Sequence, residues 1–124
     1  MEASLIGRYE VEVDKSGGVA IPNDWREFLL DESRIVYVFY DKNARCLCIV
    51  PRKTMEMELA NMQELASGDT KQKERLMMFR ENTERIHIEI NDHLKLSQRL
   101  RELAGIGDRA VLTGALRIVK VYPC

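Results

Sequence analysis

Few residues in this chain have the types and spacing that catalysis or metal binding would require. Cys46 and Cys48 are one residue apart, which on a strand puts both side chains on one face, and no second pair completes a zinc site. His87 and His93 stand at no ligand spacing from another candidate, and Ser16-Gly17-Gly18 is too short for a phosphate loop. We therefore expect no catalytic residue, metal or cofactor, no small-molecule substrate and no enzymatic activity, with Cys46 and Cys48 as buried or half-buried strand residues.

Two turn segments hold the remaining polar residues of interest. The first is Asp14-Lys15-Ser16-Gly17-Gly18, and the second is Glu89-Ile90-Asn91-Asp92-His93. A carboxylate at the start of such a turn can accept backbone amides and fix its shape, so we expect Asp14 and Glu89 to cap the two turns. Lys15 stands at the tip of the first turn, and exposed tips often carry binding residues.

The bulk composition is that of one ordinary folded domain. The chain has 124 residues, 45% hydrophobic and 31% charged, which is enough to bury one core. Its formal net charge of −1 means that contact with nucleic acid must come from a locally basic face. The sequence has no leader-like start and no run of about eighteen apolar residues, so we expect a cytoplasmic protein without membrane contact.

The chain repeats itself at an offset of 75 positions. Val11-Glu12-Val13-Asp14 overlies Ile86-His87-Ile88-Glu89, and Trp25-Arg26 overlies Leu100-Arg101. A three-residue gap then restores the register before the closing segments that end in Pro51 and Pro123. Before that gap, the offset also places Arg34 on Arg109 and Ile35-Val36-Tyr37 on Ala110-Val111-Leu112. A unit this short cannot bury its own apolar face and must pack against its copy.

The repeat predicts a single domain over residues 1–124. Two repeats, about 5–51 and 82–123, would be joined by a helical segment over about 52–81. Each repeat would contain two strands around a turn, a short helix and two further strands.

Capping residues mark where the helices should begin and end. We expect a helix over 23–30 capped by Asn23, and another that starts after Ser97 and stops at Gly105. Two helices of the middle segment should meet at Ser67-Gly68-Asp69, with Asp69 and Gln72 as a capping pair. Their methionines would fill the core or make contacts between subunits.

The stretch Gly7-Arg8-Tyr9-Glu10, followed by 13–22 and Trp25-Arg26, resembles the opening of the MraZ family of bacterial transcriptional regulators. Residues 100–106, 110–114 and 119–122 are similar to the family's second repeat, so the resemblance covers roughly 5–123. It implies a mixed, β-rich α+β fold in which tandem repeats form a swapped-hairpin (double-psi-like) β-barrel, related to AbrB-type regulators. It also implies a ring-shaped homo-oligomer that binds repeated elements in double-stranded DNA upstream of division and cell-wall genes.

The family's signature is an Asp-x-x-x-Arg motif in each repeat, and both copies are altered here. Gly18 stands in the first arginine position, while Glu89 and His93 replace the Asp and Arg of the second motif. An arginine offers a planar fork to phosphates or guanine edges, whereas glycine offers none and histidine is a weak, pH-sensitive substitute. The resemblance then implies DNA contacts from the turns and the starts of the following helices: Arg8, Lys15, Ser16, Arg26, His93, Lys95 and Arg101.

Three hypotheses remain open. The first is a MraZ-like DNA-binding transcriptional regulator of division and cell-wall genes, acting as a ring oligomer. The second, motivated by Gly18, is a diverged paralogue that keeps the oligomeric fold, has lost direct DNA binding and serves as a protein-interaction scaffold. An antitoxin is suggested only by the relationship to AbrB-like folds and ranks last.

Overall fold

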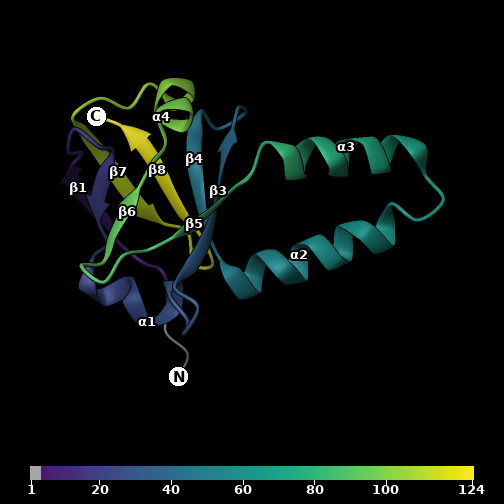
Figure 1. Cartoon of the computed structure of the whole chain (residues 1–124), viewed down its shortest axis with the longest axis horizontal. Coiled ribbons are helices and arrows are strands. Elements are labelled where there is room, and N and C mark those ends of the chain that lie inside the picture. The colour runs from purple at the N-terminus through teal and green to yellow at the C-terminus, as the bar shows by residue number, and fades with distance from the viewer. Residues whose placement is uncertain (1–3) are drawn as a thin grey trace.

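The computed structural model describes residues 4–124 and is a mixed α+β structure with antiparallel strands (Figure 1). The first half contains β1 (Arg8–Glu12), β2 (Gly18–Ala20), the 3-10 turn η1 (Asn23–Trp25), α1 (Arg26–Leu29), β3 (Ile35–Asp41) and β4 (Cys46–Pro51). The middle contains α2 (Arg52–Leu65) and α3 (Thr70–Glu81). The second half contains β5 (Glu84–His87), β6 (His93–Lys95), α4 (Gln98–Ala104), β7 (Arg109–Gly114) and β8 (Val119–Pro123).

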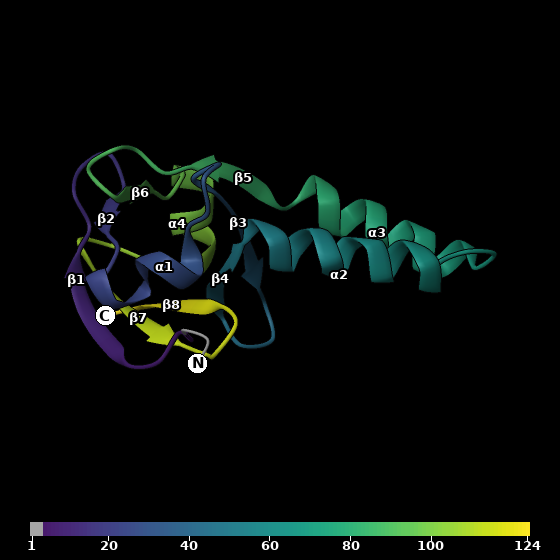
Figure 2. The ribbon, with the colours of Figure 1, turned by 90° about the horizontal axis from the view of Figure 1, so that it is seen from below.

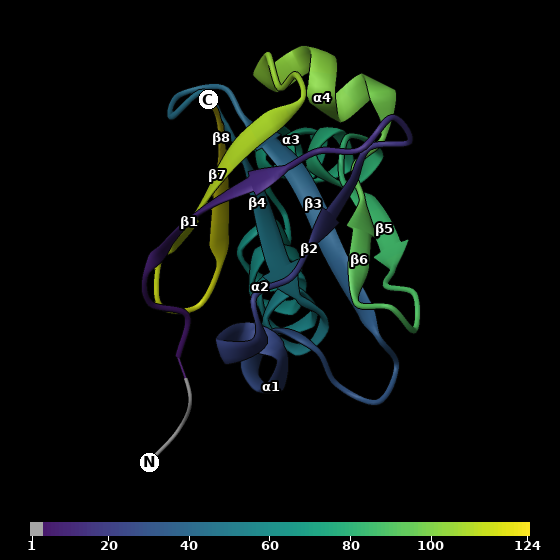
Figure 3. The same cartoon turned by 90° about the vertical axis from the view of Figure 1, so that its left-hand side faces the viewer.

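Strand pairing crosses between the two halves of the chain. The main sheet has the order β1-β7-β8-β4-β3-β5, so β1 pairs with a strand of the second half and β5 with a strand of the first. A separate two-stranded sheet joins β2 to β6, and Figure 3 shows these two strands side by side. Val19 lies directly opposite Leu94, the residue 75 positions further on. Each half therefore completes the sheets of the other.

The main core takes equivalent side chains from both halves. Trp25 and Leu100 are both buried at the centre of this cluster. Further buried residues at the 75-position offset are Val13 and Ile88, Val19 and Leu94, Ile21 and Leu96, and Leu29 and Ala104. Burial of apolar surface drives folding, so this shared core binds the halves to one another.

The strands β3 and β7 occupy equivalent places in the two halves, but their residues do not correspond at the 75-position offset that the sequence comparison predicts. Val36 pairs with Pro51 and Ala110 pairs with Pro123, which makes Val36 the counterpart of Ala110. The expected match of Ile35 with Ala110 is therefore wrong by one residue, and Arg34 corresponds to Asp108 rather than to Arg109. The reason is that the register of a strand is set by which of its side chains must be buried. A shift by one residue would move every buried side chain of the strand to the solvent-exposed face.

The short helix of the first half differs from the prediction. Residues 23–25 form a 3-10 turn and α1 is a single turn, so the expected continuous helix over 23–30 is wrong. Asn23 is not the cap, because Pro22 holds that position without a side-chain hydrogen bond. The fixed φ angle of Pro22, rather than a side-chain cap, favours the start of the 3-10 turn at this point.

Trp25 sets where this segment lies. Its indole Nε1 donates to the carbonyl of Ile6 at 2.8 Å, and its ring packs edge-on against Tyr9.

The caps predicted for α4 and for the central helices are confirmed. Ser97 Oγ accepts the amide of Leu100 at 3.2 Å, and Gly105 ends α4 with a φ of 68°. Asp69 accepts the amide of Gln72 at 3.2 Å where α3 begins, but the amide of Asp69 donates to the carbonyl of Ala66 at 3.0 Å, so only the Asp69 half of the predicted capping pair is confirmed. The helices α2 and α3 form a hairpin that projects away from the strands (Figures 1 and 2).

A second, smaller core lies under the base of this hairpin. Cys46, Cys48, Val50 and Met55 are buried there, and neither cysteine is in a disulfide. Burial raises the pKa of the Cys48 thiol to about 12, so this thiol stays protonated. The prediction of buried strand cysteines is confirmed, and they act as core residues.

Candidate functional site

The first turn is held by its own carboxylate. Asp14 Oδ1 accepts the amides of Ser16 at 2.9 Å and Gly18 at 2.8 Å, and the Ser16 hydroxyl donates to the same oxygen at 2.7 Å. The bond from Gly18, followed by the one from the Ser16 hydroxyl, holds the pKa of the Asp14 carboxyl below its usual value. Lys15 is exposed at the tip of this turn.

Gly18 is what allows the Asp14 carboxylate to lie where it does. A Cβ at this position would stand 2.5 Å from Asp14 Oδ2, closer than two unbonded atoms can approach. A side chain of any kind at position 18, arginine included, would displace the carboxylate or bend the turn. Gly18, which stands in the arginine position of the motif, thus leaves the space that the Asp14 carboxylate occupies in this turn.

The second turn is built differently from the prediction. The amide of His93 donates to Asn91 Oδ1 at 3.2 Å, and the amide of Asp92 donates to the carbonyl of Glu89 at 2.9 Å. Among the hydrogen bonds of residues 4–124, none ends on the Glu89 carboxylate, which lies 3.9 Å from Lys95 Nζ. The expectation that Glu89 caps this turn is therefore wrong, because the longer glutamate points outward and the shorter Asn91 side chain reaches the amide.

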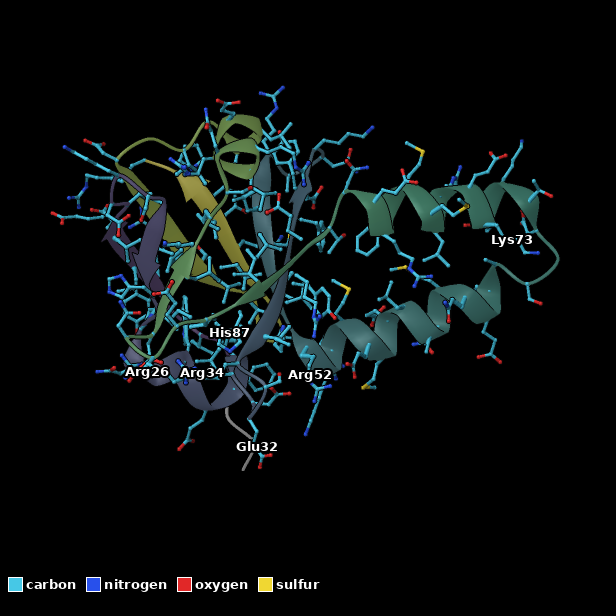
Figure 4. All side chains as sticks on the ribbon, viewed as in Figure 1. Arg26, Glu32, Arg34, Arg52, Lys73 and His87 are labelled. Carbon is cyan, nitrogen blue, oxygen red and sulfur yellow. The ribbon has the colours of Figure 1, made fainter. Side chains whose placement is uncertain are left out.

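Asp92 ties the second turn to the first half of the chain. Its carboxylate forms ion pairs with Arg26, at 3.0 Å, and with Arg34. Arg34 also donates to the carbonyls of Ile88, at 3.0 Å, and Glu89, at 2.7 Å. The hydrogen bond from Arg34, together with the charges of the two arginines, lowers the pKa of the Asp92 carboxyl. Figure 4 shows Arg26 and Arg34 next to one another on this side of the molecule.

Arg101 takes a corresponding place at the first turn. Its Nε donates to the carbonyl of Leu96 at 3.0 Å, and it packs beside Gly17, whose Cβ would lie 2.8 Å from that nitrogen. Arg26 and Arg101, both expected as DNA contacts, are thus each bound by groups of the chain itself, although the Arg26 side chain remains 43% exposed and Arg101 is half-buried. The sequence predicted a turn at Asn91-Asp92, which the structure confirms, but it did not predict the side-chain contacts of these two residues or of Arg34.

The remaining predicted residues are placed as follows. Arg8 and Lys95 are exposed on β1 and β6, and Arg8 is 3.7 Å from Glu10. Ser16 is exposed with its hydroxyl bound to Asp14, and His93 is half-buried on β6. The structure therefore brings Lys15 and Ser16 together on one turn, and His93 and Lys95 together on β6.

A cavity of about 570 Å³ opens between β1, β2 and β6. It is lined by the carboxylates of Glu12, Asp14 and Asp108 and by two side chains that can carry positive charge, His93 and Arg109. Carboxylates therefore outnumber basic side chains in this lining, whereas a phosphate-binding surface needs positive charge.

Relatives were found by sequence comparison, although no family model matches the chain. A transcriptional regulator MraZ of Shewanella amazonensis is 32% identical over 120 residues, which cover 94% of this chain and 77% of the relative. The chain belongs to the MraZ family. Another protein of this name, from a Roseiflexus species, is 26% identical over 118 residues, covering 95% of this chain and 80% of the relative. A third, from Christiangramia forsetii, is 25% identical over 122 residues.

The alignments with MraZ proteins run through both halves and the central helices, since they cover almost the whole chain. The family resemblance seen in the sequence is thereby confirmed. None of the helices in residues 4–124 is long and apolar enough to cross a membrane.

Proposed function

We propose that this MraZ-family chain is a DNA-binding transcriptional regulator, without enzymatic activity, that acts in the cytoplasm as a homo-oligomer. Its target would be repeated elements in double-stranded DNA upstream of division and cell-wall genes. The observation that carries this proposal is the match of nearly the full chain to proteins named transcriptional regulator MraZ. The two turns lie at the end of the molecule opposite the helical hairpin, which leaves them free to meet a large ligand (Figures 1 and 2).

The fold proposed for this function is a single domain in which two repeats form a swapped-hairpin barrel. The exchange of β1 and β5 between halves supports it, as does the direct pairing of β2 with β6. The last strands of the two halves, β4 and β8, also pair with each other, with Cys48 opposite Lys120. This pairing further supports the proposed fold.

The DNA contacts would come from exposed cations on and beside the turns. Lys15 lies at the tip of the first turn, Lys95 lies on β6 next to the second, and Arg8 starts β1. Ser16 and His93 would add polar contacts at the same turns. Lysine and arginine side chains bind phosphates by charge, and several copies in an oligomer would multiply a weak single contact.

The oligomer would use the helical hairpin. None of the residues of α3 is buried, and Met57, Leu65, Met77 and Met78 expose apolar side chains on the two helices. A helix of this length gains most of its stability from a packed apolar face. A second copy of the chain would provide that packing.

The second candidate, an oligomeric scaffold that no longer binds DNA directly, is favoured by one observation. Gly18 gives no arginine fork, and the neighbouring cavity carries three carboxylates that repel phosphate.

Binding of the chain to its own upstream DNA at several salt concentrations separates the two candidates. If the protein regulates through phosphate contacts, its affinity for DNA should fall steeply as the salt concentration rises. The Lys15→Ala variant should then have lower affinity for all DNA sequences, and the slope of log affinity against log salt concentration (the salt slope) should be smaller by about one. Lys73→Ala, at the far end of the hairpin (Figure 4), is the matched control, with the mass in solution checked for both variants. Absence of binding at low salt by an intact oligomer would support the scaffold.

A further inference from the structure

Arg26 and Arg101 stand 75 positions apart, and each reaches the turn of the other half. Arg26, in the first half, lies 3.0 Å from Asp92 in the second turn. Arg101, in the second half, packs beside Gly17 in the first turn, and Gly17 is the counterpart of Asp92. The two arginines therefore cross over between the halves in the same way.

Backbone hydrogen bonds repeat this crossing. The amide of Ile21 donates to the carbonyl of Asp92 at 3.1 Å, and the amide of Leu96 donates to the carbonyl of Gly17 at 2.9 Å. Donors and acceptors in both bonds are counterparts at the 75-position offset. Each turn is thus hydrogen-bonded to a strand end of the opposite half and has an arginine of that half beside it.

The second turn is fixed more strongly by charge than the first. Asp92 pairs with two arginines, and Arg34 binds two further carbonyls of the same turn. At the first turn the position of Asp92 is taken by Gly17, so Arg101 meets no carboxylate there, and its Nε donates instead to the carbonyl of Leu96 in its own half. A charged hydrogen bond is stronger than one to a neutral carbonyl.

We propose that Arg26 and Arg101 are positioning residues that hold the turn of the opposite half, and that Arg26, Arg34 and Asp92 form an ion cluster that sets the shape of the second turn. That this positioning of the turns assists DNA binding rests on the proposed function. The positioning itself is a property of the free protein and is tested without DNA.

Amide hydrogen exchange of the free oligomer tests the positioning. Arg26→Ala and Asp92→Asn should each speed exchange of the Ile21 amide about three- to tenfold. The double variant should resemble Asp92→Asn, because that single change already removes the ion pair with Arg26 as well as the one with Arg34. Arg101→Ala should act in the same way on the Leu96 amide.

Two controls sharpen this experiment. Glu27→Ala, a neighbouring charge change on α1, should leave both amides unchanged, and Arg26→Ala and Asp92→Asn should each speed exchange of the Ile21 amide more than that of the Leu96 amide at the other turn. Additive effects of Arg26→Ala and Asp92→Asn, or no acceleration in either, would overturn the proposal whatever the protein does with DNA.

DNA binding distinguishes positioning from direct contact. If Arg26 positions the turn, Arg26→Ala and Asp92→Asn both weaken binding and leave the salt slope unchanged. If Arg26 instead contacts a phosphate, Arg26→Ala lowers the slope by about one and Asp92→Asn, which frees the arginine, strengthens binding. The second pattern overturns the proposal while supporting DNA binding itself, so the two failures remain separable.

Discussion

Asp14 and Asp92 stabilise their turns by different means. Asp14 binds amides and a hydroxyl within its own turn, whereas Asp92 pairs with arginines from the other half of the chain. The first turn is a local structure and needs room for a carboxylate. The second turn depends on long-range ion pairs and should respond to charge changes elsewhere in the chain.

Gly18→Ala should destabilise the fold. The added Cβ would stand 2.5 Å from Asp14 Oδ2 and would push away the carboxylate that caps the turn. We expect a loss of about 1–3 kcal/mol in the free energy of unfolding, measured by urea titration. Gly107→Ala is the matched control, since no atom lies within 4 Å of the Cβ that this change would add. Equal stability of the two variants would contradict the capping role of Asp14.

Acid should weaken the contribution of Asp92. The hydrogen bond from Arg34 and the charges of both arginines keep the pKa of its carboxyl below the ordinary 3.8. A group whose pKa is lower in the folded state stabilises the fold fully above its unfolded pKa and loses that contribution as pH falls through the folded value.

The difference in unfolding free energy between wild type and Asp92→Asn should therefore be constant from about pH 7 to pH 5 and shrink below pH 3.8. Urea titrations at several pH values measure it. A difference that stays the same down to about pH 3 would show that the charge of Asp92 does not stabilise the folded state.

At the scale of single elements, the sequence predicts those features that depend on neighbouring residues. Ser97, Gly105 and Asp69 act as helix caps within a few residues of their own position, so their patterns alone identify them. Asn23 and Glu89 fail as predicted caps because other residues compete for the same positions, Pro22 in one case and Asn91 in the other.

The features that sequence comparison misses are those set by contacts between distant segments. The one-residue shift of β3 against β7 follows from which face is buried, and an ungapped alignment cannot detect it. Arg26 and Arg101 are basic and lie beside turns, so their pattern suits DNA contact equally well. Asp92, the partner of Arg26, and Gly17, beside which Arg101 lies, become their neighbours only in the folded chain.

Ser97→Ala should cost more than the loss of a helix cap alone. The Ser97 hydroxyl accepts the Leu100 amide and also donates to Glu84 Oε2 at 2.9 Å, which connects the start of α4 to β5. We expect a decrease of about 1–2 kcal/mol in unfolding free energy by urea titration. Ser67→Ala, in the turn between α2 and α3, is the control and should change stability little. An equal effect of the two variants would contradict this cap.

At the scale of the whole molecule, the two ends differ in chemistry. The turns lie at the strand end, and the other end is the helical hairpin (Figure 1). The turns carry charged residues, whereas the hairpin exposes apolar side chains. A second cavity, of about 310 Å³, lies between α3, α4 and the β3–β4 hairpin and is lined in part by Phe39, Met78 and Leu103. Its rim carries Lys42 and Arg99, while exposed Met57 and Leu65 on α2 stand close in sequence to Glu56 and Glu64.

These surfaces suit a contact in which α2 of one copy packs into the cavity of the next. The apolar parts would be buried together, and the acidic residues of α2 would face the basic rim. Because the two surfaces lie on different parts of the chain, the proposed contact would be head-to-tail, and such contacts close into a ring when the rotation between copies allows it.

Met78→Glu tests this arrangement, because it puts a charge into the apolar lining of the cavity, and the new carboxylate would also compete with the acidic residues of α2 for Lys42 and Arg99. Burying such a charge costs several kcal/mol, so the oligomer should dissociate at concentrations where the wild type stays assembled, as measured by mass in solution. Ile90→Glu is the matched control: Ile90 is 94% exposed at the second turn, far from the hairpin, and the same charge change there should leave the mass unaltered. An unchanged mass for Met78→Glu would place the subunit contact elsewhere on the molecule.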